Sequence, residues 1–358
     1  MSGTSLDGID AVLIEFHGDA NNAIRLINTA YQPYSAQLRE QLLELHLPSQ
    51  NELERAACIS NTLATAYAAT VNSLLKTTVV RPNQITAIGC HGQTVRHRPD
   101  LGFSLQLGNP ALLAELTGVA TVADFRNRDI AAGGQGAPLV PAFHQAMFQH
   151  ASLHRVIVNI GGIANLTNLP ISGDIDGFDC GPGNMLMDAW NLQHFGRPYD
   201  KDGAWAGSGN VIETLLDELR GHPFFSAPPP KSTGREAFNL AWLNSFLSGQ
   251  ETPADVQATL LALTVTGIQR AITEYCVGAQ EVYLCGGGAR NTVLVEQLQL
   301  ALPDRSVALT DALGVNADWL EAFAFAWLAR QTWEMRPGNL PRVTGARHPC
   351  ILGAIYPA

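Results

Sequence analysis

The sequence predicts a two-domain α/β protein. The chain has 358 residues, about twice the usual size of one domain. Strand-like and helix-like segments alternate along it, which is typical of α/β domains. Hydrophobic residues make up 46% of the chain and charged residues only 15%, and this composition excludes a disordered protein. We place the two domains at residues 1–133, possibly with the extreme C-terminus, and at 134–358.

The first half combines short apolar strands with amphipathic helices. Runs of apolar residues predict strands at Ala11–Phe16, Ile24–Tyr31, Ile85–Cys90 and Phe103–Leu107. Apolar residues that recur every three or four positions predict helices at about 35–46, from Ser49 to about Lys76, and from Asn109 to Gly118. Ser49 and Glu52 fit a capping box at the start of the second helix.

The second half repeats the alternation from about Pro138. Strands are predicted at Arg155–Ile160, Ile163–Leu169, Ile175–Asp179, Glu281–Cys285 and Val307–Thr310. Helices are predicted at 184–195, at 256–276, from about Asn291, and at 318–331.

Charge and cysteine usage narrow the class of function. The net charge of −10 and the absence of a Lys/Arg cluster disfavour nucleic acid and anionic membranes as partners. No run of 18 apolar residues predicts a membrane span, and the N-terminus does not resemble a signal peptide. The cysteines are scattered without metal-ligand spacing, so we interpret most of them as buried apolar residues in a reducing cytoplasm; they are Cys58, Cys90, Cys180, Cys276, Cys285 and Cys350.

Two glycine-containing turns stand at matching places in the two halves. Residues 3–8 (GTSLDG) precede the strand Ala11–Phe16, and residues 159–165 (NIGGIAN) lie between two strands. Such a turn can direct several backbone N–H groups at one anion, and glycine lets a phosphate approach. Each could also be an ordinary hairpin turn. The occurrence of both in matching places favours a phosphate-binding pair.

A third element is the strand 282–285 followed by Gly286, Gly287 and Gly288 and then a helix. Three residues without side chains after a buried strand suit a nucleotide base and ribose that lie across the backbone. The pattern matches neither G-x-G-x-x-G nor the P-loop, so Rossmann and P-loop folds lose their main support.

Together these elements resemble the superfamily of acetate and sugar kinases, Hsp70 and actin, which implies two ribonuclease-H-like domains around a central cleft that holds the nucleotide. Over nearly the whole chain the sequence resembles the anhydro-N-acetylmuramic acid kinase family, through the motifs MSGTSLDGID, HGQT, DFRNRD, GGQGAPLVP, NIGGIANLT, FDCGPGNMLMD, PKSTGRE and LEAFAFAWLA. The resemblance implies an enzyme that uses ATP, Mg²⁺ and water to convert 1,6-anhydro-N-acetylmuramic acid to N-acetylmuramic acid 6-phosphate in cell-wall recycling. It also implies a cytoplasmic homodimer.

The resemblance implies roles for residues in the glycine turns and after one strand. Asp179 matches the base that activates water, although a helix N-cap is the alternative. Asp7 and Glu321 are metal candidates, with an Asx-turn and a solvated helix start as their alternatives. The positions assigned to ATP are Ser2, Gly3, Thr4, Ser5, Asp7, Gly8, Asn159, Gly161, Gly162, Gly286, Gly287 and Gly288.

Two polar loops of the first half are candidates for binding the sugar. They contain His91, Gln93, Arg126, Arg128 and Asp129. Because the substrate carries a lactyl carboxylate, Arg126 or Arg128 suits it, unless that arginine pairs with Asp124 or Asp129 instead. In the second half a loop after three prolines either contacts substrate or is structural; its polar residues are Lys231, Ser232, Thr233 and Arg235.

Two positions depart from the family pattern. Only Met1 and Ser2 precede Gly3 where a full strand is expected, so we expect a version with that strand to be more stable. Cys180 replaces an expected Thr beside Asp179, which should change rate more than reaction. The alternative functions are an ordinary sugar kinase, which would leave no ¹⁸O from water on the anomeric carbon, and a nucleotide-gated binding protein, whose ATP turnover would not depend on sugar.

Overall fold

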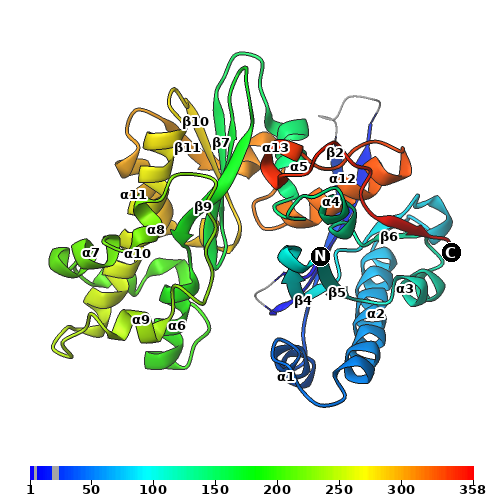
Figure 1. Cartoon of the computed structure of the whole chain (residues 1–358), viewed down its shortest axis with the longest axis horizontal. Coiled ribbons are helices and arrows are strands. Elements are labelled where there is room, and N and C mark those ends of the chain that lie inside the picture. Colours follow the sequence, from blue (N-terminus) through cyan, green and yellow to red (C-terminus); the bar gives the residue numbers. More distant parts are fainter. Residues whose placement is uncertain (4–5, 18–23) are drawn as a thin grey trace. The chain divides into compact units, whose positions relative to one another are not determined.

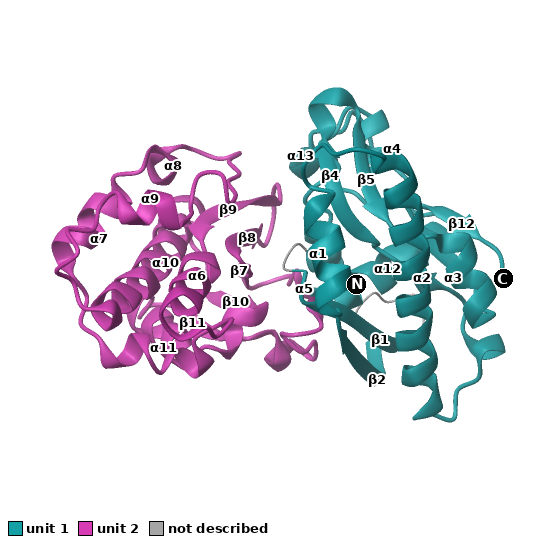
Figure 2. Ribbon diagram, turned by 90° about the horizontal axis from the view of Figure 1, so that it is seen from below, with its two compact units in different colours: residues 1–147, 321–358 teal, residues 148–320 magenta. Residues whose placement is uncertain are grey.

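The computed structural model describes residues 1–3, 6–17 and 24–358. Two compact units divide the chain (Figures 1 and 2): unit 1 contains residues 1–147 and 321–358, and unit 2 contains 148–320. The predicted boundary at 133/134 therefore lies before the observed one. The reason is that helix α5 (Val140–Phe148) packs within unit 1, where the ring of Phe143 contacts Trp327 of helix α12 (Leu320–Trp333).

Unit 1 begins with an antiparallel pair of strands and ends with a strand from the end of the chain. Its strands are β1 (Gly8–Phe16), β2 (Ile24–Pro33), β3 (Ile88–Gly89), β4 (Gln93–Arg98), β5 (Phe103–Leu107), β6 (Thr121–Ala123) and β12 (Ala354–Tyr356). Its other helices are α1 (Ala36–Glu44), α2 (Glu52–Lys76), α3 (Pro110–Thr117), α4 (Asn127–Ala131) and α13 (Pro341–Thr344).

The strands of unit 1 form three small sheets. β1 pairs with β2 and β4 with β5, both antiparallel, while β6 lies between β3 and β12. The long helix α2 packs against β1 and β2 and buries Leu63 and Ala64 in a core shared with Leu42 of α1. At the other edge of β1, the backbone of Met1 exchanges hydrogen bonds with that of Asp10.

Three predictions for the first half need correction. The strand 85–90 is reduced to β3, because its partner β6 is itself only three residues long. Gln93, expected in a loop, begins strand β4. Helix α2 starts at Glu52 without a full capping box, because the Ser49 hydroxyl accepts a hydrogen bond from Arg55 rather than from the helix backbone.

Unit 2 consists of one five-stranded sheet covered by helices. Its strands are β7 (Arg155–Ile160), β8 (Ile163–Leu169), β9 (Asp176–Pro182), β10 (Glu281–Cys285) and β11 (Ser306–Leu309). Its helices are α6 (Met185–Phe195), α7 (Glu213–Arg220), α8 (Pro223–Ser226), α9 (Leu240–Asn244), α10 (Pro253–Tyr275) and α11 (Thr292–Ala301). The predicted bounds of β7, β8 and β10 are confirmed.

The sheet of unit 2 has the strand order β11-β10-β7-β8-β9. β7, β8 and β9 are antiparallel neighbours, whereas β10 and β11 run parallel to β7. Val156, Ile157 and Val158 of β7 are all buried, as expected for a central strand covered on both faces. α10 packs against β8 and β9. This order and these directions are those of a ribonuclease-H-like domain.

The end of β9 differs from the prediction. The strand continues past Asp179, because Gly181 and Pro182 pair with Ala164 and Ile163 of β8. Asp179 therefore lies within the ladder, beside a bulge that Cys180 forms in β9.

Two further sequence predictions can be compared with the described part of the chain. No helix there is long and apolar enough to cross a membrane. The six cysteines are free thiols, of which five are buried as predicted, while Cys58 is exposed.

Candidate active site

The turn between β7 and β8 in unit 2 is held by the start of helix α6. The Gly161 carbonyl accepts from the Asn184 amide at 2.8 Å, and the Gly162 carbonyl accepts from the Gly183 amide at 2.9 Å. A Cβ on Gly183 would lie 2.3 Å from the Gly161 oxygen, so only glycine fits there. These hydrogen bonds use the carbonyl groups of Gly161 and Gly162 and fix the turn on the start of α6. The backbone N–H groups of the same two glycines take no part in them.

The remaining amides of this turn are suited to an anion. Within the described ranges, the N–H groups of Gly161 and Gly162 have no hydrogen-bond acceptor, and Gly162 is exposed. Two adjacent unpaired N–H groups in a glycine turn are a recurring way to bind phosphate without a basic side chain. An ordinary hairpin turn was the alternative, and the unpaired amides favour the anion-binding interpretation.

The glycine segment after β10 lies against the same strand, β7. A Cβ on Gly286, whose φ is +79°, would lie 2.3 Å from Asn159 Oδ1, and a Cβ on Gly288 would lie 2.3 Å from the Ile160 side chain. Asn184 Nδ2 donates to the Ile160 carbonyl at 3.2 Å. The structure thus brings the predicted residues Asn159 and Gly286–Gly288 together. It adds Asn184, whose only signal in the sequence was its place after Gly183.

Asp179 holds a half-buried carboxylate on β9. Its Oδ2 accepts a hydrogen bond from the Thr233 amide at 2.8 Å, and its own amide donates to the Lys231 carbonyl at 3.1 Å. Burial raises the pKa of Asp179 from 3.8 to about 6, although the Thr233 N–H works in the opposite direction. Helix α6 begins at Met185 after Asn184, so Asp179 is not its N-cap.

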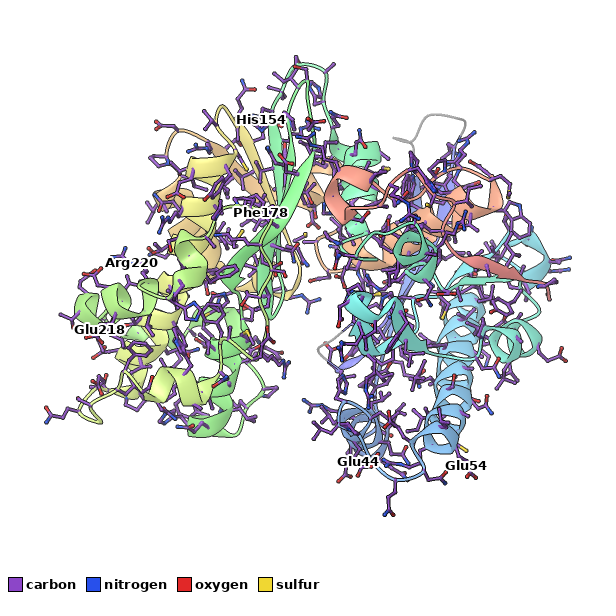
Figure 3. All side chains as sticks on the ribbon, viewed as in Figure 1. Glu44, Glu54, His154, Phe178, Glu218 and Arg220 are labelled. Carbon is purple, nitrogen blue, oxygen red and sulfur yellow. The ribbon has the colours of Figure 1, made fainter. Side chains whose placement is uncertain are left out.

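The loop after the three prolines is held beside Asp179 by aromatic side chains. Lys231 Nζ donates to the Phe224 carbonyl at 3.2 Å and lies 4.7 Å from the centre of the Phe224 ring. Tyr275 packs at right angles on Phe178, the neighbour of Asp179 that Figure 3 labels. The loop thereby presents the Thr233 amide to the carboxylate.

A second carboxylate of unit 2 was missed by sequence reasoning. Asp188 lies in the first turn of α6, and burial together with the charge of Asp200 raises its pKa to about 7, opposed by Arg235. It ends the motif FDCGPGNMLMD, and its burial could not be read from the sequence.

In unit 1, Arg126 and His91 form a buried pair. Arg126 Nη2 lies 2.8 Å from His91 Nε2, and Arg126 Nη1 donates to the Gly136 carbonyl at 2.8 Å. Guanidinium can only donate, so His91 Nε2 accepts, and the proton sits on Nδ1, which donates to the Gly92 carbonyl at 2.7 Å. Burial and the Arg126 charge lower the pKa of His91 well below its usual value, which keeps the ring neutral.

Glu321 at the start of α12 belongs to the same region. Burial raises its pKa, and the positive charge of Arg126 opposes that rise. Burial also lowers the pKa of Arg126 to about 10, with Glu321 opposing. Glu321 is therefore partly removed from solvent, and it lies close enough to Arg126 for the two charges to interact. Arg128, the alternative to Arg126, is exposed.

Three predicted ligand residues are instead engaged inside unit 1. The Ser2 hydroxyl is buried and donates to the Gly92 carbonyl at 3.1 Å while contacting Tyr67. Gln93 is fully buried and donates to the Gly3 carbonyl at 3.0 Å. Asp129 is also fully buried, with protein donors on both of its oxygens. All three side chains are buried, and each is already hydrogen-bonded to another residue of unit 1.

The first glycine turn is only partly described. Thr4 and Ser5 lie outside the described residues. Asp7 is exposed, and its Oδ1 accepts from the Gly8 amide at 3.0 Å, whereas an Asx-turn would use the amide of the second following residue, Ile9. A Cβ on Gly8 would lie 2.6 Å from the Gln32 carbonyl, so glycine is required for the close approach of β2.

A cavity of about 150 Å³ opens beside His91 in unit 1. Its walls come from the β4–β5 hairpin and from the segments that follow β3 and β6. The residues that line it include the polar side chains of His91, Ser104, Gln106, Asp124, Asn127 and Tyr356. Ligand pockets usually measure about 300–1,000 Å³, so this cavity has room for part of a sugar and not for a whole one.

The fold and the glycine turns define the class of protein. A ribonuclease-H-like unit with a glycine turn between β7 and β8 and a glycine segment after the neighbouring strand β10 has the architecture of the actin and sugar-kinase class.

Comparisons with known proteins identify the family. The profile described as anhydro-N-acetylmuramic acid kinase matches residues 1–358. Proteins named anhydro-N-acetylmuramic acid kinase from Nitrosospira multiformis and Nitrosomonas europaea are each 59% identical over 360 residues, covering 100% of this chain and 98% of theirs. A ROK family glucokinase from Streptomyces griseus matches with a TM-score of 0.36 and 11% identity, covering 90% of this chain and 99% of its own. The chain belongs to the anhydro-N-acetylmuramic acid kinase family.

Proposed function

We propose that this enzyme uses ATP and water to convert 1,6-anhydro-N-acetylmuramic acid to N-acetylmuramic acid 6-phosphate, with Asp179 as the base. The family match and the names of the relatives support the kinase activity. The observation that carries the hydrolytic step is the half-buried Asp179 carboxylate, which the Thr233 amide holds by one oxygen.

The chemistry assigns Asp179 a single proton transfer. Water attacks the anomeric carbon, the bond from that carbon to the bridging oxygen breaks, and the water proton goes to the free oxygen of Asp179. The released O6 attacks the γ-phosphorus, and ADP leaves. A base is most effective when its pKa lies near the working pH, and a pKa of about 6 leaves Asp179 ionised and still basic at neutral pH.

The nucleotide is assigned to the glycine elements of unit 2. The amides of Gly161 and Gly162 would donate to a phosphate, because the structure gives them no other acceptor among the described residues. Gly286–Gly288 offer backbone without side chains, which suits the adenosine. No basic side chain is needed, which agrees with the acidic composition of the chain.

Mg²⁺ fits the first glycine turn as a single-carboxylate site. The described residues contain no group of three His, Cys, Asp or Glu that could hold a metal, but Mg²⁺ in kinases is usually bound by one or two carboxylates together with substrate phosphates. Asp7, which is exposed, would provide that carboxylate. Glu321 fits less well, because the positive charge of Arg126 acts on it and would repel a bound cation. Bound Mg²⁺ spreads the charge that develops on the transferred phosphoryl group.

Arg126 is the group that we assign to the lactyl carboxylate of the sugar. His91 and the Gly136 carbonyl hold its guanidinium at fixed positions, so little side-chain freedom is lost on binding. His91, which contacts Arg126, also lines the cavity of unit 1, and the polar walls of that cavity would contact part of the sugar. Lys231 and Thr233 act by shaping the surroundings of Asp179.

The experiment that tests this function is turnover of the anhydro sugar with ATP and Mg²⁺ in ¹⁸O-water. Wild-type protein should place one ¹⁸O on the anomeric carbon per phosphate transferred. Asp179→Asn should retain ATP binding and lose turnover. Phosphorylation without ¹⁸O incorporation would instead establish an ordinary sugar kinase, and ATP turnover independent of sugar would establish a nucleotide-gated protein.

One further assignment follows from the proposed reaction. Because ATP is supplied in the cytoplasm, the reaction places the protein there. The homodimer implied by the resemblance stays a prediction.

A further inference from the structure

Asp129 carries a fully buried carboxylate that no substrate can reach. Its Oδ2 accepts from the Gly136 amide at 2.8 Å. Its Oδ1 accepts from Asn339 Nδ2 at 2.6 Å and from the Thr344 hydroxyl at 2.7 Å. Burying a carboxylate is costly unless donors replace water, and three neutral donors do so here. The carboxylate therefore joins three segments of unit 1: helix α4, which carries Asp129, the glycine loop 133–136, and the C-terminal segment 339–347.

One of these segments also holds Arg126. The Gly136 N–H donates to Asp129, and the Gly136 carbonyl oxygen accepts a hydrogen bond from Arg126 Nη1 at 2.8 Å. Its φ of +66° is accessible mainly to glycine, and a Cβ would lie 2.8 Å from the Ile130 side chain. Asp129 and Arg126 are thus linked through a single glycine.

The third segment comes from the end of the chain. Besides the Thr344 hydroxyl, the Thr344 carbonyl accepts from the Gln135 amide at 2.7 Å, and the Arg347 amide donates to the Ala132 carbonyl at 2.9 Å. The glycine loop 133–136 is fixed by backbone and side chain together. A Cβ on Gly134 would lie 2.2 Å from Asp129 Oδ2, so the loop closes directly on the carboxylate.

We propose that Asp129 is a positioning residue that, with Thr344 and Asn339, holds Arg126 in place for the substrate carboxylate. This rests on the proposed role of Arg126. The C-terminal segment 339–347 thereby takes part in substrate selection without contacting substrate, since it acts through Gly136. Asp129 is assigned this role in place of the substrate contact predicted from the sequence.

Thr344→Val and Asp129→Asn test the proposal on the full-length enzyme. Val keeps the shape of Thr344 and removes the donor. Thr117→Val is the matched control, because Thr117 is equally buried in unit 1 and its hydroxyl donates only to carbonyls of its own helix. KM is measured for the anhydro sugar and for the same sugar without its lactyl group, and amide exchange is measured at Gly136.

If Asp129 acts through Arg126, the two test variants raise KM for the carboxylate-bearing sugar, by about threefold for Thr344→Val and about tenfold or more for Asp129→Asn. KM for the sugar without the carboxylate, kcat, and the control variant stay within about twofold of wild type. In an Arg126→Ala background, Thr344→Val has no further effect on KM. Exchange of the Gly136 amide becomes faster in both test variants.

Equal increases of KM for both sugars, or unchanged exchange at Gly136, would overturn the positioning role. If Asp129→Asn does not fold, the same measurements on Thr344→Val still test the positioning role. If instead the proposed role of Arg126 is wrong, Arg126→Ala changes KM equally for the sugar with the lactyl carboxylate and for the sugar without it. In that case Gly136 exchange still decides whether Asp129 fixes the glycine loop.

Discussion

Replacing Asp179 with Asn is expected to abolish turnover and to stabilise the protein above pH 7. Burial raises the pKa of Asp179 from 3.8 to about 6, so the folded state binds this proton more tightly than the unfolded state. The stability that protonation contributes is present below pH 4 and is lost as pH rises through 6. Each pKa unit corresponds to about 1.4 kcal/mol, so the ionised carboxylate costs up to roughly 3 kcal/mol at pH 8. Asn keeps an oxygen for the Thr233 N–H and avoids that cost.

Thermal unfolding of the two proteins at pH 4 and pH 8 measures the effect. The variant should unfold at a higher temperature than wild type at pH 8, by about 2–4 °C for each kcal/mol in a unit of this size, and the difference should shrink towards pH 4. Asp176→Asn is the control, because it neutralises an exposed carboxylate of the same strand. A variant no more stable than wild type at pH 8 would refute the reasoning that the site retains a costly charge for catalysis.

The other predictions concern pH, nucleotide and metal. With Asp179 as the base, kcat/KM should fall about tenfold per pH unit below about 6, and a profile flat to pH 5 would contradict the assignment. Gly286→Ala should raise KM for ATP at least about tenfold, because its Cβ would meet Asn159; Gly314→Ala, which has a similar φ of +82° and open space around it, controls for backbone strain, and equal effects would remove the steric argument. Asp7→Asn should raise the Mg²⁺ concentration for half-maximal rate, chelation should abolish the reaction, and an unchanged Mg²⁺ dependence would exclude Asp7 as ligand.

Local hydrophobic patterns in the sequence were enough to predict most strands of unit 2. β7 and β10 are buried on both faces, so each contains a short run of apolar residues, at 156–158 and 282–285, next to polar residues or glycine. β4 was missed for the opposite reason. Its sequence QTVRHR is mostly polar, because the β4–β5 hairpin exposes much of its surface, and nothing in it distinguishes a strand from a loop.

The chemistry of the site was predictable where it depended on residue type alone. The glycine turns and Asp179 are recognisable because the functions proposed for them require those residue types. The roles of Asp129 and His91 were not, because they depend on distant partners. Asn339 and Thr344 lie 210 and 215 residues after Asp129. The sequence around His91 likewise does not reveal that Arg126 donates a hydrogen bond to its Nε2.

The discontinuity of unit 1 has a consequence for synthesis on the ribosome. Residues 148–320 form unit 2 from one continuous segment, whereas unit 1 needs residues 321–358 to cover β6 with β12 and to reach Asp129. At about 5–20 residues per second, the first 147 residues wait roughly 10–40 s for that final segment. The half that is made first is therefore completed last. A chain shortened at its C-terminus would damage the N-terminal unit and leave unit 2 intact.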